Sequence, residues 1–226
     1  MIKYIGFLTL LITASVVAQG PSVNPSINDK FLDPKLNVEE WTQKFETESR
    51  EIFFQREKIV GLVGATPGKV IADIGAGTGL FTLPLSRIVG TEGKVDAVEI
   101  SKKFLEHIRT RAASANATNV ETVLCTDKSV ELPEASADLA FICDVYHHFE
   151  YPRETMQTLH KALRPGGELV LIDFKRIPGE STEFILNHVR AGQEVFESEI
   201  TAAGFEKTGE VKDVLKENYI IRFKKR

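Results

Sequence analysis

A short apolar run that leads directly into a cluster of glycines constrains the fold of this chain more than any other feature. Residues 70–74 are rich in β-branched side chains, and apolar side chains return at helical spacing over residues 79–89. Between them stands the sequence Asp73-Ile74-Gly75-Ala76-Gly77-Thr78-Gly79. Glycines permit a tight turn and let a ligand lie directly against the backbone. The pattern predicts a strand, a glycine turn and a helix, with a ligand site at the turn.

The rest of the chain repeats this alternation of strand and helix patterns. Residues 38–63 predict one or two amphipathic helices, and further strands are expected over residues 95–100, 120–125, 139–145 and 169–174. The last two strands, near Val211 and over residues 219–223, are a short turn apart and should pair antiparallel. Parallel strands joined by helices form a sheet that is covered on both faces. The sequence therefore predicts an α/β fold, a three-layer sandwich.

The residues that end the predicted strands are the first candidates for ligand binding, because ligands bind at the carboxyl ends of the strands in such sheets. Glu99 can accept both hydroxyls of a ribose, and Asp127 can accept from the amine of an adenine. Asp73 suits a cationic ligand better than a phosphate. A nicotinamide site is disfavoured, since the third glycine of its G-x-G-x-x-G motif would fall at Leu80.

Taken together, these residues resemble the class I S-adenosylmethionine-dependent methyltransferases, and the resemblance covers nearly all of residues 38–226. It implies S-adenosylmethionine as the cofactor and a Rossmann-like, seven-stranded, mostly parallel sheet of order 3-2-1-4-5-7-6 with the last strand antiparallel. The glycine turn would hold the methionine part of the cofactor, and Asp144 would lie beneath the sulfonium. The cofactor-binding residues implied by the resemblance are Asp73, Gly75, Ala76, Gly77, Gly79, Glu99, Ile100, Asp127 and Asp144.

The two cysteines provide a check on the implied strand order. Cys125 and Cys143 would lie three strand spacings apart, about 14 Å at ~4.8 Å each, beyond the ~7 Å limit for a disulfide. We therefore expect two free, buried thiols.

Two neighbouring histidines are the candidate catalytic residues. His147 and His148 follow the fourth predicted strand, beside the expected methyl group, and either could take a proton from a hydroxyl or an acidic carbon of the acceptor. The alternative is that both only pack or hydrogen-bond in the pocket. In an extended segment they should point to opposite sides, so we expect no metal site from this pair. A metal site that combines His188 with Glu194 or Glu197 has no compact ligand spacing to support it.

Charged residues after the fifth strand could contribute to an acceptor pocket. Lys175, Arg176, His188 and Arg190 could hold an anionic acceptor, or they could form a solvated rim. The segment 41–54 could cover the pocket with Arg50 or Glu51 facing inward, or it could simply pack against the domain.

The first residues differ in kind from the rest. Lys3 precedes an apolar run that ends in Val16-Val17-Ala18, small side chains at the positions that a signal peptidase reads. This run of about 14 residues is shorter than the ~20 that a membrane-spanning helix needs. We expect a signal peptide over residues 1–18, cleaved after Ala18, and a secreted or periplasmic protein. Residues 19–37 contain three prolines and predict a linker or an ordered wrap.

The charge balance narrows the class of partner. With 28 basic and 32 acidic residues, the formal net charge is -4, which offers no footprint for nucleic acid or anionic lipid. The sequence thus predicts an exported S-adenosylmethionine-dependent methyltransferase of a small-molecule acceptor, with no nucleic-acid partner and no stable membrane span. The alternative is a non-catalytic exported protein that keeps this fold and binds a ligand.

Overall fold

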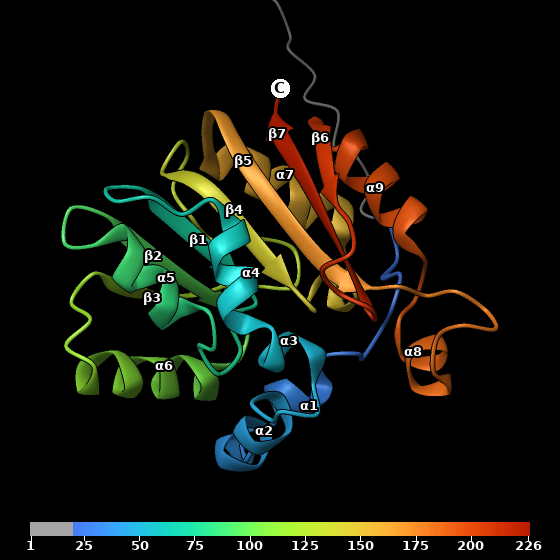
Figure 1. Cartoon of the computed structure of the whole chain (residues 1–226), viewed down its shortest axis with the longest axis horizontal. Coiled ribbons are helices and arrows are strands. Elements are labelled where there is room, and N and C mark those ends of the chain that lie inside the picture. Colours follow the sequence, from blue (N-terminus) through green and yellow to red (C-terminus); the bar gives the residue numbers. More distant parts are fainter. Residues whose placement is uncertain (1–19) are drawn as a thin grey trace, which may run out of the picture.

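The computed structural model describes residues 20–226, so the predicted signal peptide lies outside the described residues. One seven-stranded sheet has helices on both of its faces (Figure 1). The strands are β1 (Val70–Ile74), β2 (Lys94–Glu99), β3 (Val120–Leu124), β4 (Ala137–Cys143), β5 (Leu163–Phe174), β6 (Phe205–Val211) and β7 (Asn218–Lys225). The helices are α1 (Asp29–Leu32), α2 (Val38–Phe45), α3 (Glu51–Phe54), α4 (Arg56–Val63), α5 (Thr82–Val89), α6 (Lys102–Ser114), η1 (Tyr146–His148), α7 (Pro152–Ala162), α8 (Glu183–His188) and α9 (Gln193–Ala202).

The strand order is β3-β2-β1-β4-β5-β7-β6, which confirms the predicted topology. β1 to β5 pair in parallel, and β7 runs antiparallel to both β5 and β6. The strand order reverses between β1 and β4. The connections that leave these two strands therefore run to opposite sides of the sheet, and a crevice opens at the carboxyl ends of the strands.

The core consists of two apolar layers, one on each face of the sheet. On one face, Met156 and Leu159 of α7 and Phe196 of α9 pack against the sheet. On the other face, Ile59 of α4 and Leu85 of α5 do the same. The central strands contact both layers, so they are apolar almost throughout, as parallel strands covered on two sides must be.

The cysteines agree with the observed strand order. Cys125 follows β3 and Cys143 ends β4, with β2 and β1 between the two strands, and both thiols are free. Each side chain is partly exposed, whereas full burial was expected.

The segment 20–37 is an ordered wrap against the domain. The backbone N–H of Val23 donates to the carbonyl of Glu150 at 2.9 Å, and the side-chain amide of Asn28 donates to the carbonyl of His148 at 3.0 Å. α1 lies within this segment and α2 and α3 follow it, and the three helices lie together beyond the end of β4 (Figure 1). A helix able to span a bilayer is not found between residues 20 and 226.

Candidate functional site

A cavity of about 600 Å³ opens at the carboxyl ends of the central strands. Its size is typical of a small-molecule site. The predicted site residues that line it are Asp73, Gly75, Ala76, Gly77, Glu99, Ile100, Asp127, Asp144, His147 and His148. Gly79 lies outside the lining and faces α6, where a Cβ on this residue would meet Ile108 at 3.1 Å.

The floor of the cavity is the glycine turn after β1. Gly75 has a φ of 69°, and a Cβ there would lie 2.4 Å from a methyl carbon of Val145. Gly77 also has a positive φ. A side chain at Gly75 would therefore be excluded both by backbone conformation and by the close approach of the β4 end. This turn presents backbone to the cavity.

Glu99 joins the ends of β1 and β2. One of its carboxylate oxygens accepts from the N–H of Gly77 at 2.9 Å, and the other accepts from Ile100 at 2.8 Å and Ser101 at 2.9 Å. Burial raises the pKa of Glu99, and these three amides oppose the shift. A carboxylate oxygen can accept more than one hydrogen bond, so the group can still receive ribose hydroxyls. Ser101 is the N-cap residue of α6, but its hydroxyl makes no cap hydrogen bond.

Asp73 is a buried carboxylate at the start of the glycine turn. It accepts from the hydroxyl of Thr82 at 2.6 Å, and its side chain is almost inaccessible to solvent. Burial raises the pKa of Asp73 to about 7, Thr82 opposes this shift, and the charge of Glu99 adds to it. Among the described residues, no cationic side chain lies within ion-pair distance of Asp73. A cationic ligand group in the cavity would supply the missing charge, which fits the ammonium of S-adenosylmethionine.

Asp144 stands directly after β4 and holds two other elements in place. Its φ of 54° is rare for a residue other than glycine. One carboxylate oxygen accepts from Arg50 at 2.6 Å, and the other accepts from Asn218 of β7 at 2.6 Å. Burial raises the pKa of Asp144 to about 6, and the Arg50 guanidinium opposes this shift. Of the two residues that could face inward from segment 41–54, Arg50 thus reaches the site through Asp144.

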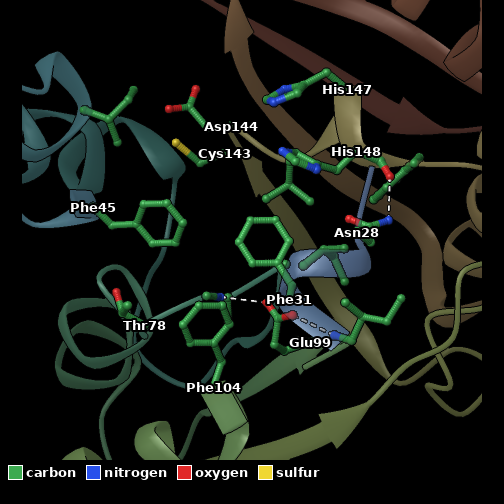
Figure 2. A pocket seen from close by; sticks show the side chains of 18 of the residues that line it. Asn28, Phe31, Phe45, Thr78, Glu99, Phe104, Cys143, Asp144, His147 and His148 are labelled. Carbon is green, nitrogen blue, oxygen red and sulfur yellow. Dashed lines mark hydrogen bonds between the residues drawn. The ribbon is translucent and has the colours of Figure 1, made fainter. Parts of the chain in front are cut away.

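An aromatic wall closes the cavity on the side of α1 and α2. We define it as Phe31, Trp41, Phe45 and Phe104. The ring centroid of Phe31 lies 6.0 Å from that of Phe104 and 5.5 Å from that of His148 (Figure 2). The rings of Trp41 and Phe45 lie beside it, tilted by 46° to each other with their centroids 5.2 Å apart. Phe31 was not predicted as a site residue, because no local signal indicates where a wrap segment places its side chains.

The two predicted catalytic histidines lie next to Phe31 of the aromatic wall. His147 is buried, and its Nδ1 lies 2.8 Å from a carboxylate oxygen of Asp173, while its backbone N–H donates to the second oxygen at 3.2 Å. The prediction that His147 and His148 point to opposite sides is wrong, because η1 is a helical turn and not an extended segment. Their ring centroids are 4.4 Å apart.

His188 of α8 completes this group. Its ring centroid lies 5.0 Å from that of His147 and 5.1 Å from that of His148. Burial lowers the pKa of His148 to about 2 and that of His188 to about 4, and repulsion from the neighbouring imidazoles adds to both shifts. These two rings are therefore neutral at pH 7. Asp173, a carboxylate in the otherwise apolar stretch 169–174 of β5, was the one signal that could have predicted a partner for His147.

The other cationic side chains that follow β5 bond to neighbouring backbone carbonyls or to a neighbouring carboxylate. Lys175 donates to the carbonyls of Leu215 and Lys216, and Arg176 donates to the carbonyls of Val189 and Leu186. Arg190 forms a bidentate ion pair with Glu199 at 2.9 and 2.6 Å. These side chains stabilise the loops around the cavity, so neither a shared anion site nor a freely solvated rim describes them.

The cavity divides into two halves that differ in their lining. The cofactor half, named for the ligand that the sequence predicts there, comprises residues 75–78 of the glycine turn together with Asp73, Glu99, Ile100 and Asp127. The acceptor half comprises the aromatic wall and the three histidines. Asp144 also lines the cavity and is assigned to neither half.

Comparison with known proteins finds similarity over the part of the chain that contains the cofactor half. The family profile described as "Methyltransferase domain" matches residues 72–171. The ubiquinone/menaquinone biosynthesis C-methyltransferase UbiE of Marinomonas sp. is 27% identical over 118 residues, which cover 52% of this chain and 47% of that protein. The same enzyme of Vibrio cholerae is 29% identical over 114 residues, 50% of this chain and 44% of that protein. The chain thus spans about half the length of these curated relatives.

Solved structures extend the likeness over most of the chain. A SAM dependent methyltransferase from Aquifex aeolicus superposes with a TM-score of 0.73 at 22% identity, covering 84% of this chain and 99% of that one. A possible exported protein from Bordetella parapertussis gives 0.65 at 16% identity, covering 84% and 79%. At these identities the likeness shows the fold. Residues 72–171 thus match the profile of a methyltransferase domain, and the chain has the fold of the class I S-adenosylmethionine-dependent methyltransferases.

Proposed function

We propose that this protein transfers a methyl group from S-adenosylmethionine to a small-molecule acceptor. The observation that carries the proposal is the cofactor half of the cavity, where a backbone floor, a buried unpaired carboxylate and a carboxylate held by three amides stand together. When bound, S-adenosylmethionine supplies a methyl group on a positively charged sulfur.

In the cofactor half, each residue has a distinct binding role. Asp73 binds the ammonium group, and the amides of the glycine turn hold the adjoining carboxylate. Glu99 accepts the ribose hydroxyls, with Ile100 beside the adenosine. Asp127 lines the cavity after β3, where it accepts from the adenine amine.

In the acceptor half, the aromatic wall excludes water and His147 handles the proton. Asp173 fixes the ring of His147 through Nδ1, so that Nε2 is the free nitrogen. A base of this kind accepts the proton of a hydroxyl or an acidic carbon as the acceptor becomes nucleophilic, and the carboxylate stabilises the resulting imidazolium. The aromatic wall favours an acceptor with an apolar, ring-shaped body. The quinone-pathway names of the relatives support that choice.

We further propose that the protein is exported. The support is the leader-like pattern of residues 1–18 together with the fold shared with a possible exported protein. N-terminal sequencing of protein expressed with this leader should find a mature chain that begins at Gln19. An intact N-terminus in an export-competent host would contradict this proposal and leave methyl transfer untouched.

Calorimetric titration with S-adenosylmethionine and S-adenosylhomocysteine tests the cofactor half. Wild type should bind both, and Glu99→Ala should bind about 100-fold more weakly, because two hydrogen bonds to a charged group are lost. Glu99→Gln is measured in parallel, since it keeps the side chain that spans the turn. The matched control is Glu121→Ala on the adjacent β3, where the carboxylate is exposed and pairs with Lys94.

Three outcomes of the titration are informative. Binding in wild type that survives in Glu99→Ala would overturn the assigned ribose site. The absence of binding to either ligand in wild type would overturn the proposed function. If wild type binds both ligands but mass spectrometry finds no methyl gain in any compound of an aromatic hydroxyl library incubated with the protein, the alternative of a non-catalytic ligand-binding protein is favoured.

A further inference from the structure

We propose that His147, His148 and His188 form a binding site for one divalent transition-metal ion, best matched by Zn²⁺, at the acceptor end of the cavity. One ring nitrogen of each residue lies within 4.8 Å of the corresponding atoms of the other two. In a tetrahedral zinc site with bonds of about 2.0 Å, neighbouring nitrogens are about 3.3 Å apart. For an ion to bind, the three nitrogens would close from separations of at most 4.8 Å to this spacing.

The fold brings these residues together from two separate segments. His147 and His148 are adjacent on η1, whose helical turn carries both rings to the same side. His188 is the last residue of α8, and its ring contacts both of the others, with Phe184 stacked on it at 5.1 Å. All three histidines line the cavity. The protein has five histidines, so three of the five gather at one point.

Asp173 gives His147 the environment of a metal ligand. Histidines that bind metals commonly donate their second ring N–H to a carboxylate, which fixes the ring and raises the basicity of the ligating nitrogen. The Nδ1 of His147 lies 2.8 Å from Asp173, which leaves Nε2 for an ion. Asp173 is fully buried and also accepts from the backbone N–H of Phe174 at 2.8 Å, so its position is fixed.

Two observations indicate that the group is incomplete without a ligand. The Nδ1 of His148 is buried and has no hydrogen-bond partner among the described residues, although buried polar atoms are normally satisfied. In addition, two buried carboxylates, Asp144 and Asp173, lie near the histidines, and Arg50 is the cation that pairs with the first of them. A divalent cation would satisfy the free nitrogen and offset the buried negative charge.

The donor set indicates the class of metal. Three neutral imidazoles suit Zn²⁺ and the neighbouring divalent ions Co²⁺, Ni²⁺ and Cu²⁺, whereas Mg²⁺ and Ca²⁺ require oxygen ligands. A site with three protein ligands keeps a fourth position open, as in catalytic zinc centres. Here that position faces the cavity.

The catalytic consequence of the site rests on the proposed function, but metal binding itself does not. An ion in this position can coordinate a hydroxyl or thiol of the acceptor and lower its pKa, so that the proton leaves to solvent. The metal would use the Nε2 lone pair of His147, so the ion and not the free imidazole would then promote deprotonation.

Metal titration of the purified full chain, after treatment with a chelator, tests the site. Equilibrium dialysis with elemental analysis should find one Zn²⁺ per chain, and Co²⁺ should give visible d–d bands that one equivalent of Zn²⁺ abolishes. His148→Gln and His188→Gln should each lose the Co²⁺ bands. Asp173→Asn should keep binding but weaken it about 10- to 100-fold, as is typical when a carboxylate behind a histidine ligand is removed.

His107→Gln is the matched control, since His107 lies on α6 outside the cavity lining, and it should bind as wild type does. Circular dichroism and thermal unfolding of each variant separate loss of the site from loss of the fold. The proposal is overturned if wild type binds neither ion, or if folded His148→Gln and His188→Gln both bind as wild type does. S-adenosylhomocysteine binding, measured on the same samples, keeps the two proposals separate, because it involves the other half of the cavity.

Discussion

The two halves of the cavity are built in different ways. In the cofactor half, the backbone carries most of the polar contacts: the glycine turn and Glu99 join the ends of two adjacent strands through main-chain amides. In the acceptor half, side chains from distant segments meet, as where Asn28 of the wrap reaches the carbonyl of His148, 120 positions along the chain. The first half is local and regular, and the second depends on how the whole domain packs.

The two halves therefore differ in how readily amino-acid substitutions can change their binding properties. A floor made of backbone can bind the same cofactor whatever side chains surround it. A wall made of side chains can change with few substitutions, because loops and wraps tolerate change better than core strands. The acceptor half is therefore where we expect specificity to reside.

The largest effect should follow Gly75→Ala. The added Cβ would lie 2.4 Å from a methyl carbon of Val145 and at a φ of 69°, so the turn must shift. We expect S-adenosylhomocysteine binding to be lost and the free energy of unfolding to fall by about 2 kcal/mol or more. Calorimetry and urea unfolding measure the two effects.

Gly61→Ala is the matched control, because Gly61 lies in α4 with open space around its Cα. Alanine there should stabilise the protein by about 0.5–1 kcal/mol and leave binding unchanged. If Gly75→Ala bound the ligand as wild type does, the backbone would not be the floor of the cofactor half.

An intermediate effect should appear in the way that stability and ligand binding depend on pH, because of Asp73. Because the pKa of Asp73 is about 7 in the folded chain against 3.8 when exposed, burial disfavours the charged form. The stabilising contribution of protonated Asp73 is therefore complete below pH 3.8 and is lost as the pH rises through 7. Binding of a ligand with an ammonium group has the opposite sign, since it requires the charged carboxylate and should strengthen as the pH rises through 7.

Asp73→Asn should remove both dependences. We expect its melting temperature to exceed that of wild type at pH 8, and its affinity for S-adenosylhomocysteine to be weak and nearly constant between pH 6 and pH 8. Thermal unfolding and calorimetry over this range test the prediction. A wild-type affinity that does not change across this range would show that Asp73 does not face the ammonium group.

The smallest effect should follow Asn28→Ala in the wrap. The substitution removes the hydrogen bond to the carbonyl of His148, so stability should fall by about 1 kcal/mol. Affinity for S-adenosylhomocysteine should change less than about threefold, because the bond lies in the acceptor half. Asn24→Ala, where the corresponding contact to His147 is longer at 3.4 Å, should cost less. A loss of cofactor affinity as large as in Gly75→Ala would mean that the halves are not separable.

Much of the cofactor half could be predicted before the structure was known. The predicted first strand matches β1 residue for residue, and the strand order agrees throughout. Asp73, Glu99 and the first two glycines line the cavity as expected. These features are readable because a strand, a turn and a helix encode their geometry within about 20 consecutive residues, through periodicity and glycine placement.

The acceptor half became clear only in three dimensions. Whether His147 and His148 diverge or converge depends on one helical turn, η1, which apolar periodicity does not reveal. The pairing of His147 with Asp173, the approach of His188 and the position of Phe31 all join segments that are far apart in the chain. These side chains meet because separate helices and strands pack together. A local pattern of residues does not indicate which distant segments will come into contact.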